Sequence, residues 1–161
     1  MQIAPSENLR FAAIAITAVV ATSVMGQIAT YPNLEPWYAG LAKPSFTPPD
    51  WLFAPVWTSL YAMMAFAFWR VLRAHKTVQR RTAIFLFALV LILNAAWSWM
   101  FFGAQSPLLG LVNIAPQLVI IGVTIAVFWR MDRAASLLLL PLAMWVAYAA
   151  VLNFAIWRLN G

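Results

Sequence analysis

The chain has 161 residues, of which 65% are hydrophobic and only 9% are charged, against about 25% charged in a typical soluble domain. Ten Lys and Arg against four Asp and Glu give a net charge of +6, and the mean hydropathy is +0.84. So few charges exclude a water-soluble domain, and we interpret the basic residues as markers of membrane topology rather than as a nucleic-acid surface.

Long uncharged stretches mark the places where the chain crosses a membrane. A spanning helix needs about 20 mostly apolar residues, because the hydrocarbon core is about 30 Å thick and a helix rises about 1.5 Å per residue. The stretches that meet this need are 11–34, 51–69, 82–129 and 134–157, and turn residues at 103–107 divide the third into two. None alternates apolar and polar residues as a barrel strand does. The sequence therefore predicts an all-α membrane protein, a single domain over 1–161 with five transmembrane helices near 9–31, 51–74, 81–102, 107–129 and 134–158.

The first predicted helix is expected to be a retained span rather than a signal peptide. The preceding residues, 1–10, carry one Arg that Glu7 offsets, and the apolar run exceeds the usual length of about 7–15 residues.

The connection between the first two predicted helices, residues 32–50, is rich in proline and aromatic residues. These are Pro32, Pro36, Pro44, Pro48, Pro49, Trp37, Tyr38 and Phe46. Because proline fixes φ and lacks an amide donor, the segment is expected to be stiff and not to continue the helix. Loops of this composition are usually ordered against another surface. We expect a lid over the outer ends of the helices.

Basic residues are distributed unequally between the two ends of the predicted bundle. With five spans, one end carries eight of the ten cations, namely Arg10, Arg70, Arg73, Lys76, Arg80, Arg81, Arg130 and Arg133. The other end carries Lys43 and Arg158. By the positive-inside rule, the N-terminus is predicted in the cytoplasm, and the 32–50 loop and the C-terminus on the opposite side.

The predicted spans offer little acid, base or metal chemistry. All charged residues and the single histidine, His75, lie at or outside the span ends, and no cysteine is present. Ion-coupled transporters generally need an ionisable group inside the bilayer, so a small drug/proton antiporter is not expected. No helix offers a set of metal ligands, so we predict neither a metal site nor a cofactor.

Two helix faces each combine a large aromatic ring with an amide. At helical spacing these are Asn94, Trp97 and Phe101 in the third span, and Trp145, Ala149, Leu152 and Asn153 in the fifth. One interpretation is helix packing with interhelical hydrogen bonds. The other is a small-molecule pocket with aromatic walls and few polar groups. The residues alone leave both open.

Residues 37–51 resemble the signature loop of the translocator protein family, whose members are also called tryptophan-rich sensory proteins or peripheral benzodiazepine receptors. The run reads WYAGLAKPSFTPPDW, and PVWTSLY at 55–61 continues it. Residues 94–97 and 101–103 resemble the family's third helix. Pro141, Trp145, Leu152-Asn153 and Trp157-Arg158 resemble its fifth helix. The resemblance covers nearly the whole chain.

The resemblance implies a five-helix bundle, commonly a homodimer in the lipid bilayer, that binds porphyrins, synthetic isoquinoline and benzodiazepine ligands, and sterols in eukaryotic members. Carried over to this sequence, the ligand pocket would use Tyr38, Pro44, Trp51, Asn94, Trp97, Trp145, Ala149 and Asn153. Lys43 would face the propionates of a tetrapyrrole directed toward the lid. Phe154 stands where the animal sterol motif has a tyrosine, so sterol recognition is not expected.

Three functions are compatible with this resemblance. The first is a membrane receptor or sensor that binds protoporphyrin-like tetrapyrroles and related apolar ligands, with a regulatory role in tetrapyrrole and stress metabolism. The second is a light- and oxygen-dependent enzyme that degrades porphyrin, with Trp51 and Trp145 as the candidate catalytic residues. The third is a passive transporter of porphyrin or sterol-like ligands.

Overall fold

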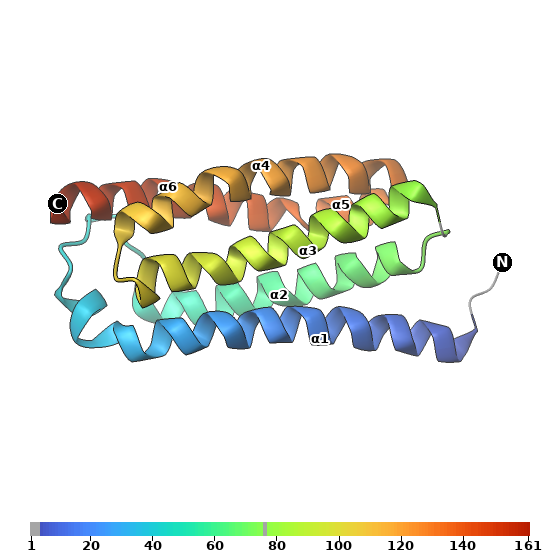
Figure 1. Cartoon of the computed structure of the whole chain (residues 1–161), viewed down its shortest axis with the longest axis horizontal. Coiled ribbons are helices and arrows are strands. Elements are labelled where there is room, and N and C mark those ends of the chain that lie inside the picture. Colours follow the sequence, from blue (N-terminus) through green and yellow to red (C-terminus); the bar gives the residue numbers. More distant parts are fainter. Residues whose placement is uncertain (1–3, 76) are drawn as a thin grey trace.

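The computed structural model describes residues 4–75 and 77–161, and the regular elements in this part of the chain are all helical. The long helices run side by side, with the two termini at opposite ends of the bundle (Figure 1). They are α1 (Pro5–Thr30), α2 (Asp50–Leu72), α3 (Val78–Ser98), α4 (Pro107–Met131), α5 (Arg133–Leu137) and α6 (Leu140–Asn160). Short helical turns follow α1 and α3, namely η1 (Tyr31–Asn33), η2 (Leu34–Tyr38) and η3 (Trp99–Gly103).

Five helical stretches in the described residues are long and apolar enough to cross a membrane. They are Pro5–Tyr38, Asp50–Leu72, Val78–Gly103, Pro107–Met131 and Arg133–Asn160. The prediction of an all-α membrane protein with five spanning helices is therefore confirmed.

The first and last spans differ from their predicted bounds. Helix α1 begins at Pro5, because proline is well accommodated in a first helical turn and Glu7 there favours the positive end of the helix dipole. The last span is interrupted at Leu138 and Leu139, where α5 ends and α6 begins with Pro141 in its first turn. Proline has no amide hydrogen and its ring clashes with the preceding turn, which disfavours a continuous helix at this point.

Polar side chains fix where several helices begin. Thr77 and Ser106 each accept a hydrogen bond from the backbone N–H three residues later, at 3.2 Å in both cases. Asp132 does the same for Ala135 at 3.0 Å, and it also forms an ion pair with Arg70 of α2 at 2.9 Å. Burial raises the pKa of the Asp132 carboxyl, but the hydrogen bonds from Ala135 and Arg70 outweigh this effect and hold the pKa below its usual value.

Aromatic rings fill the half of the bundle that lies nearer the N-terminus. The rings of Phe68 and Phe87 stack with centroids 4.4 Å apart, and Phe128 stacks on Phe87 at 6.1 Å. Met64 and Ile121 are also fully buried in this cluster. Such rings pack α2, α3 and α4 tightly at this end. Toward the other end of the bundle, the interior is less completely filled by side chains.

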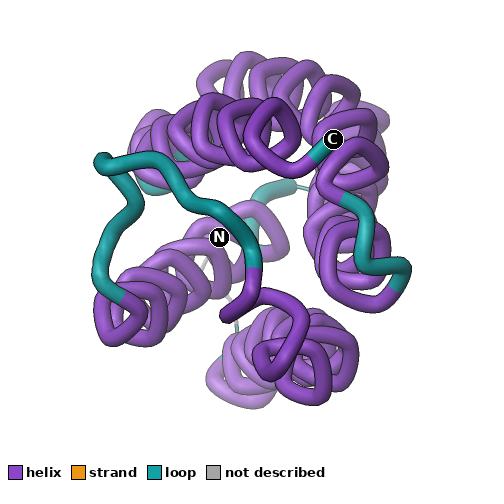
Figure 2. Tube along the Cα trace, turned by 90° about the vertical axis from the view of Figure 1, so that its left-hand side faces the viewer, coloured by secondary structure: helices purple, strands orange, loops and turns teal. Residues whose placement is uncertain are grey.

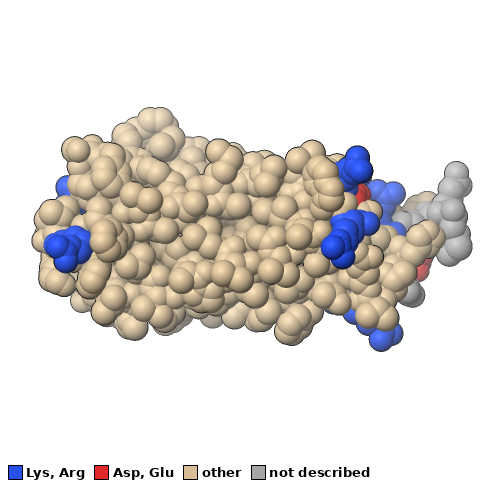
Figure 3. Space-filling view, turned by 90° about the horizontal axis from the view of Figure 1, so that it is seen from above, with Lys and Arg blue, Asp and Glu red and all other residues tan. Residues whose placement is uncertain are grey.

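The outer surface is apolar along the length of the bundle. Large hydrophobic side chains are exposed on every long helix, for example Ile16, Phe66, Phe85, Val119 and Met144. On the face seen in Figure 3, the blue basic side chains gather at the two ends and the band between them is uncharged. A surface of this kind suits the hydrocarbon core of a bilayer.

The segment between α1 and α2 is ordered and partly helical. We expected its prolines to prevent a continued helix, and the chain does leave helical geometry at Glu35 (φ −129°, ψ 141°). Glu35 directly precedes Pro36, and a residue before proline is forced toward extended backbone. The helical turns η1 and η2, however, make the segment more regular than a loop. Residues 39–49 then run across the end of the bundle (Figure 2).

Contacts with α6 hold this segment in place; we call residues 31–49 the lid. Asn160 accepts a hydrogen bond from Ala42 N at 2.9 Å, and its Nδ2 donates to Ala42 O at 2.9 Å. The hydroxyl of Tyr148 donates to Phe46 O at 2.7 Å. The rings of Trp37 and Tyr38 pack on Phe101 and Phe102 of η3.

Candidate functional site

A cavity of about 580 Å³ lies under the lid, in the half of the bundle that the stacked rings leave open. Its walls come from α1, α2, α3, α4 and α6, with η1, η2 and η3 at the lid end. Pockets for small organic ligands usually measure about 300–1,000 Å³. The space is therefore large enough for an organic ligand of several fused or linked rings.

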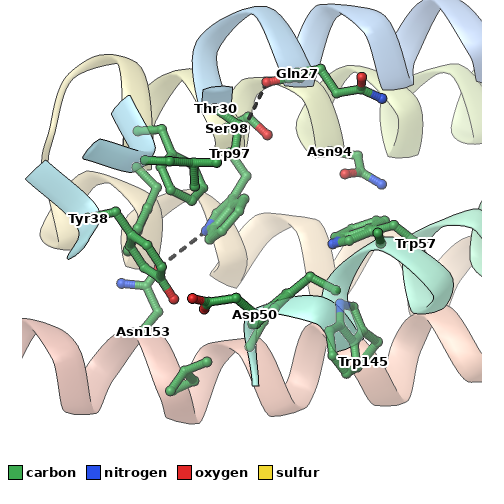
Figure 4. A pocket seen from close by; sticks show the side chains of 18 of the residues that line it. Gln27, Thr30, Tyr38, Asp50, Trp57, Asn94, Trp97, Ser98, Trp145 and Asn153 are labelled. Atoms are coloured by element: carbon green, nitrogen blue, oxygen red, sulfur yellow. Dashed lines mark hydrogen bonds between the residues drawn. The ribbon is translucent and has the colours of Figure 1, made fainter. Parts of the chain in front are cut away.

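Indole rings form much of the cavity wall. Trp57, Trp97 and Trp145 line the cavity from three different helices (Figure 4). Each ring is held by a neighbour. Trp97 stacks on Phe101 with centroids 5.0 Å apart, Trp145 meets the edge of Phe53 at 5.8 Å, and Trp57 lies against Tyr61 at 5.3 Å. These contacts orient the rings, and aromatic faces of this kind attract flat apolar molecules.

Asn153 connects three helices at the edge of the cavity. Its Oδ1 accepts a hydrogen bond from Trp97 Nε1 at 3.2 Å, and its Nδ2 donates to Pro107 O at 2.6 Å. The side chain is 2% exposed. Both of its polar atoms are thus used by the protein, which favours the interhelical-packing interpretation for this residue.

Asn94 lies one helical turn deeper than Trp97 and has different surroundings. The residue is 4% exposed, it lines the cavity, and its Nδ2 has no hydrogen-bond partner among the described residues. Asn94 points into the space between Gln27 and Trp57 (Figure 4). The Nδ2 atom is itself buried, so this donor is unsatisfied within the described part of the chain.

The charged residues that line the cavity are Glu35, Lys43 and Asp50, all at the lid end. Lys43 Nζ lies 4.4 Å from the centroid of the Tyr38 ring. The carboxylate of Asp50 is directed into the cavity beside Tyr38 (Figure 4). The mouth of the cavity therefore presents one ammonium group and two carboxylates, whereas the deeper walls are uncharged.

The structure brings together most of the site residues that the sequence predicts. Seven of the nine line the cavity: Tyr38, Lys43, Asn94, Trp97, Trp145, Ala149 and Asn153. Pro44 and Trp51 are not part of this lining. The side chain of Trp51 is 71% exposed in the first turn of α2. Its neighbour Asp50 faces the cavity, and because successive helical residues are turned by about 100°, Trp51 faces outward.

Sequence reasoning missed the wall that α1 contributes. Ser23, Gly26, Gln27 and Thr30 line the cavity at i, i+3, i+4 and i+7, which is the spacing of one helix face. The signal was a stripe of small and polar residues in an otherwise apolar span. Gln117 of α4 was also missed, because a single amide in a long apolar stretch does not reveal which way it faces.

Comparison with known proteins identifies relatives of this chain. Residues 13–158 match the TspO/MBR family. The tryptophan-rich protein TspO of Chlorobaculum tepidum is 44% identical over 149 residues, which cover 92% of this chain and 94% of the relative. The protein of the same name from Archaeoglobus fulgidus is 40% identical over 153 residues, with 90% and 94% coverage. The human translocator protein is 35% identical over 127 residues, with 77% and 75% coverage.

Proposed function

The chain belongs to the TspO/MBR family, and from this premise we propose that it is a membrane receptor that binds tetrapyrroles of the protoporphyrin type in the cavity under the lid. We propose a regulatory role for this binding in tetrapyrrole and stress metabolism. Curated relatives carry the names tryptophan-rich sensory protein and translocator protein, which fit a protein that senses or handles a ligand.

The observation that carries the proposal is the combination of cavity volume and indole walls. A tetrapyrrole is a wide, flat π-system, and three indoles from α2, α3 and α6 border a space of about 580 Å³. Stacking on such rings contributes about 0.5–1.5 kcal/mol per pair beyond the burial of apolar area. A globular apolar ligand would gain less from flat walls, so the geometry favours a planar one.

The charges at the mouth support an orientation for the ligand. The propionates of a tetrapyrrole need water or a cation, and Lys43 is the cation in the cavity lining. The propionates would therefore lie at the lid, with the hydrocarbon edge directed inward. Arg158, the other basic residue expected at this end, is not in the lining. The carboxylates of Glu35 and Asp50 repel the propionates, which limits the favourable electrostatic contribution of Lys43 to binding.

Light-driven degradation of the bound ligand is a second candidate function. The observation in its favour is that Trp145, together with Trp57 and Trp97, borders the cavity, so oxidisable rings would contact a photoexcited porphyrin. The exposed side chain of Trp51 is not in this wall. We therefore propose Trp145 rather than Trp51 as the ring that would exchange an electron with the ligand.

The asymmetry of the basic residues supports an orientation in the membrane. We propose that the N-terminal end, with Arg10, Arg73, Arg81 and Arg130 among its basic residues, faces the cytoplasm. Lys76 belongs to the same group in the sequence but lies outside the described residues. The lid and the C-terminus would then lie on the opposite side.

We also propose a homodimer, with α4 as the contacting helix. Gly122 and Ala126 are exposed on α4 and are four residues apart, and a Cβ added at Gly122 would meet no atom within 4 Å. Small residues at this spacing let two helices approach closely in a membrane. By contrast, Gly26 of α1 already packs within the chain, against Ser98.

The proposed binding is tested by titrating the purified protein in detergent with protoporphyrin and following tryptophan fluorescence. Saturable quenching with about one ligand per chain is expected, since the cavity holds the indoles and one flat ligand of this size. Quenching that rises linearly with ligand, as it does for partition into empty micelles, would contradict the proposal.

A further inference from the structure

One short sequence pattern occurs twice in this chain, at the ends of two membrane-spanning helices. Residues 68–73 read FWRVLR and residues 128–133 read FWRMDR, so both follow the order Phe-Trp-Arg-x-x-Arg; we call them the FWR segments. The first ends α2 and the second joins α4 to α5, so both lie at the N-terminal end of the bundle (Figure 1). A partial copy, IWR at 156–158, lies at the opposite end and lacks the second arginine.

The phenylalanine that begins each FWR segment is buried, and both pack on the same ring. Phe68 stacks on Phe87 of α3 with centroids 4.4 Å apart, and Phe128 stacks on Phe87 at 6.1 Å. Because one ring contacts both, the two segments lie at a similar depth in the bundle. They are also joined directly, since Arg70 of the first segment forms an ion pair with Asp132 of the second at 2.9 Å. The two copies therefore form one continuous surface.

The last arginine of each FWR segment lies over the indole of the same segment. The distance from Arg73 Cζ to the Trp69 ring centroid is 4.4 Å, and that from Arg133 Cζ to the Trp129 ring centroid is 5.3 Å. Both arginines and Trp129 are exposed. Trp69 is fixed in turn by a hydrogen bond from its Nε1 to Asn8 Oδ1 of α1, at 3.2 Å. A ring holds a guanidinium group in a defined place without neutralising its charge.

The acidic side chains at this end leave the two stacked arginines without a counter-ion. Asp132 is bonded to Arg70, and Glu7 lies in the first turn of α1. In the described part of the chain, neither Arg73 nor Arg133 forms an ion pair. Their guanidinium groups therefore keep their positive charge at the edge of the apolar surface. The fork of N–H donors on a guanidinium group matches the oxygens of a phosphate.

We propose that the FWR segments form a binding surface for the headgroups of anionic phospholipids, such as phosphatidylglycerol, in the leaflet on the N-terminal side. Tryptophan favours the depth at which headgroups meet the hydrocarbon core, so the indoles hold the arginines at the level of the lipid phosphates. A choline headgroup carries its own cation, which the arginines repel, and an anionic headgroup does not. None of these residues lines the cavity, so the surface is separate from the proposed tetrapyrrole site.

The experiment is native mass spectrometry of the full chain from detergent, with phosphatidylglycerol and phosphatidylcholine of identical acyl chains as probes. Identical chains bury the same apolar area, so the ratio of the two affinities reports the headgroup. The wild type is expected to favour phosphatidylglycerol. Arg73→Gln and Arg133→Gln are each expected to lower the ratio about fivefold, which is the contribution of one basic residue near an anionic surface.

Trp129→Leu tests the role of the ring, because it keeps every charge and removes the indole under Arg133. The ratio is expected to fall about two- to fivefold, which corresponds to one cation–π contact. Arg81→Gln is the control for total charge. Arg81 is an exposed cation at the same end, and it lies over no ring among the described residues. Its replacement is expected to change the ratio less than about twofold, since salt screens a charge outside the surface.

The inference is overturned if the wild type binds both lipids equally, or if the ratio is unchanged in Arg73→Gln, Arg133→Gln and Trp129→Leu. A loss in Arg81→Gln as large as that in Arg133→Gln also overturns it, because overall charge alone would then attract the lipid. Excess inorganic phosphate separates the two sources of the anion. It should leave phosphatidylglycerol bound, and complete displacement would assign the arginines to a soluble anion instead.

Discussion

The indole N–H of Trp97 in α3 donates to Oδ1 of Asn153 in α6 across the lid end of the cavity, at 3.2 Å. The same asparagine donates to Pro107 O at the start of α4, at 2.6 Å. One buried amide therefore holds three helices around the ligand cavity. Asn153 therefore fixes the position of the Trp97 ring in the cavity wall. It also fixes how the third and fifth predicted spans lie against each other.

A substitution of Gly110 is expected to disturb this support. A Cβ at Gly110 would lie 2.7 Å from Asn153 Oδ1 and 2.9 Å from Phe101 Cδ2. Gly110→Ala should therefore displace both side chains and lower the free energy of unfolding by about 1–3 kcal/mol. Thermal unfolding of the purified protein in detergent measures this loss.

Gly40→Ala is the control for Gly110→Ala. Gly40 is an exposed residue of the lid, and an added Cβ there meets nothing within 4 Å. This variant should therefore keep the thermal midpoint of the wild type. Equal losses in the two variants would show that close packing at Gly110 is not the cause.

Charge changes at the cavity mouth should act in opposite directions on protoporphyrin affinity. Lys43→Gln removes the cation that the propionates would meet, and Asp50→Asn removes a carboxylate that repels them. Exposed charge pairs contribute about 0.2–1 kcal/mol, so affinity should fall up to about fivefold in the first variant and rise by a similar factor in the second. Titrations at low and high salt measure both effects, which should shrink as salt rises. The same sign in both variants would place the propionates elsewhere.

The sequence predicts the helical spans well because each one is a long uncharged stretch between charged or turn residues. It also predicts which faces of α3 and α6 meet, since Asn94 with Trp97 and Trp145 with Ala149 follow helical spacing. It does not predict the direction of Trp51, which depends on where α2 begins. With α2 beginning at Asp50, the carboxylate faces inward and the indole faces outward, and a shift of one residue, which turns the helix by about 100°, would bring Trp51 to the direction of Asp50.

The lid shows a second limit of sequence reasoning. Its prolines predict a break in the helix, and the break occurs at Glu35. Its attachment to Asn160 and Tyr148 joins residues more than 100 positions apart. Such pairings depend on how α6 packs in the bundle, and local composition carries no information about them. Among the deeper residues, composition also does not distinguish the satisfied Asn153 from the unsatisfied Asn94.

The orientation in the membrane is tested with single cysteines, because the natural chain has none. Ser45 in the lid and His75 between α2 and α3 are both exposed. In intact cells or sealed right-side-out vesicles, Ser45→Cys should react with a membrane-impermeant thiol reagent and His75→Cys should react only after permeabilisation. The reverse pattern would place the N-terminus outside the cytoplasm.

Replacement of tryptophan by phenylalanine separates binding from photochemistry. In Trp145→Phe an apolar ring is kept, so protoporphyrin affinity should fall by about tenfold at most, which is about 1.4 kcal/mol. If the indole exchanges an electron with the excited ligand, the rate of light-driven porphyrin loss should fall much further, because phenylalanine is harder to oxidise. Affinity and rate that decline in parallel would make Trp145 a wall residue only.

Trp51→Phe serves as the control for Trp145→Phe. The Trp51 side chain is 71% exposed and is not part of the cavity lining. Both the affinity and the rate should therefore stay within about twofold of the wild type, as expected for a surface substitution. A larger loss at Trp51 than at Trp145 would contradict the placement of the photochemical ring in α6.

The central claim is that tetrapyrroles bind in the cavity, and the most direct test is to fill that cavity. Ala149 lines it, whereas Ala147, two residues earlier in α6, is exposed on the outer surface. Leucine is a good helix former, so both Ala149→Leu and Ala147→Leu should fold. Protoporphyrin affinity, measured by quenching of tryptophan fluorescence, should fall about five- to 150-fold in Ala149→Leu, since overpacking costs about 1–3 kcal/mol, and should be unchanged in Ala147→Leu. Unchanged affinity in a well-folded Ala149→Leu protein would contradict the assignment of this cavity as the binding site.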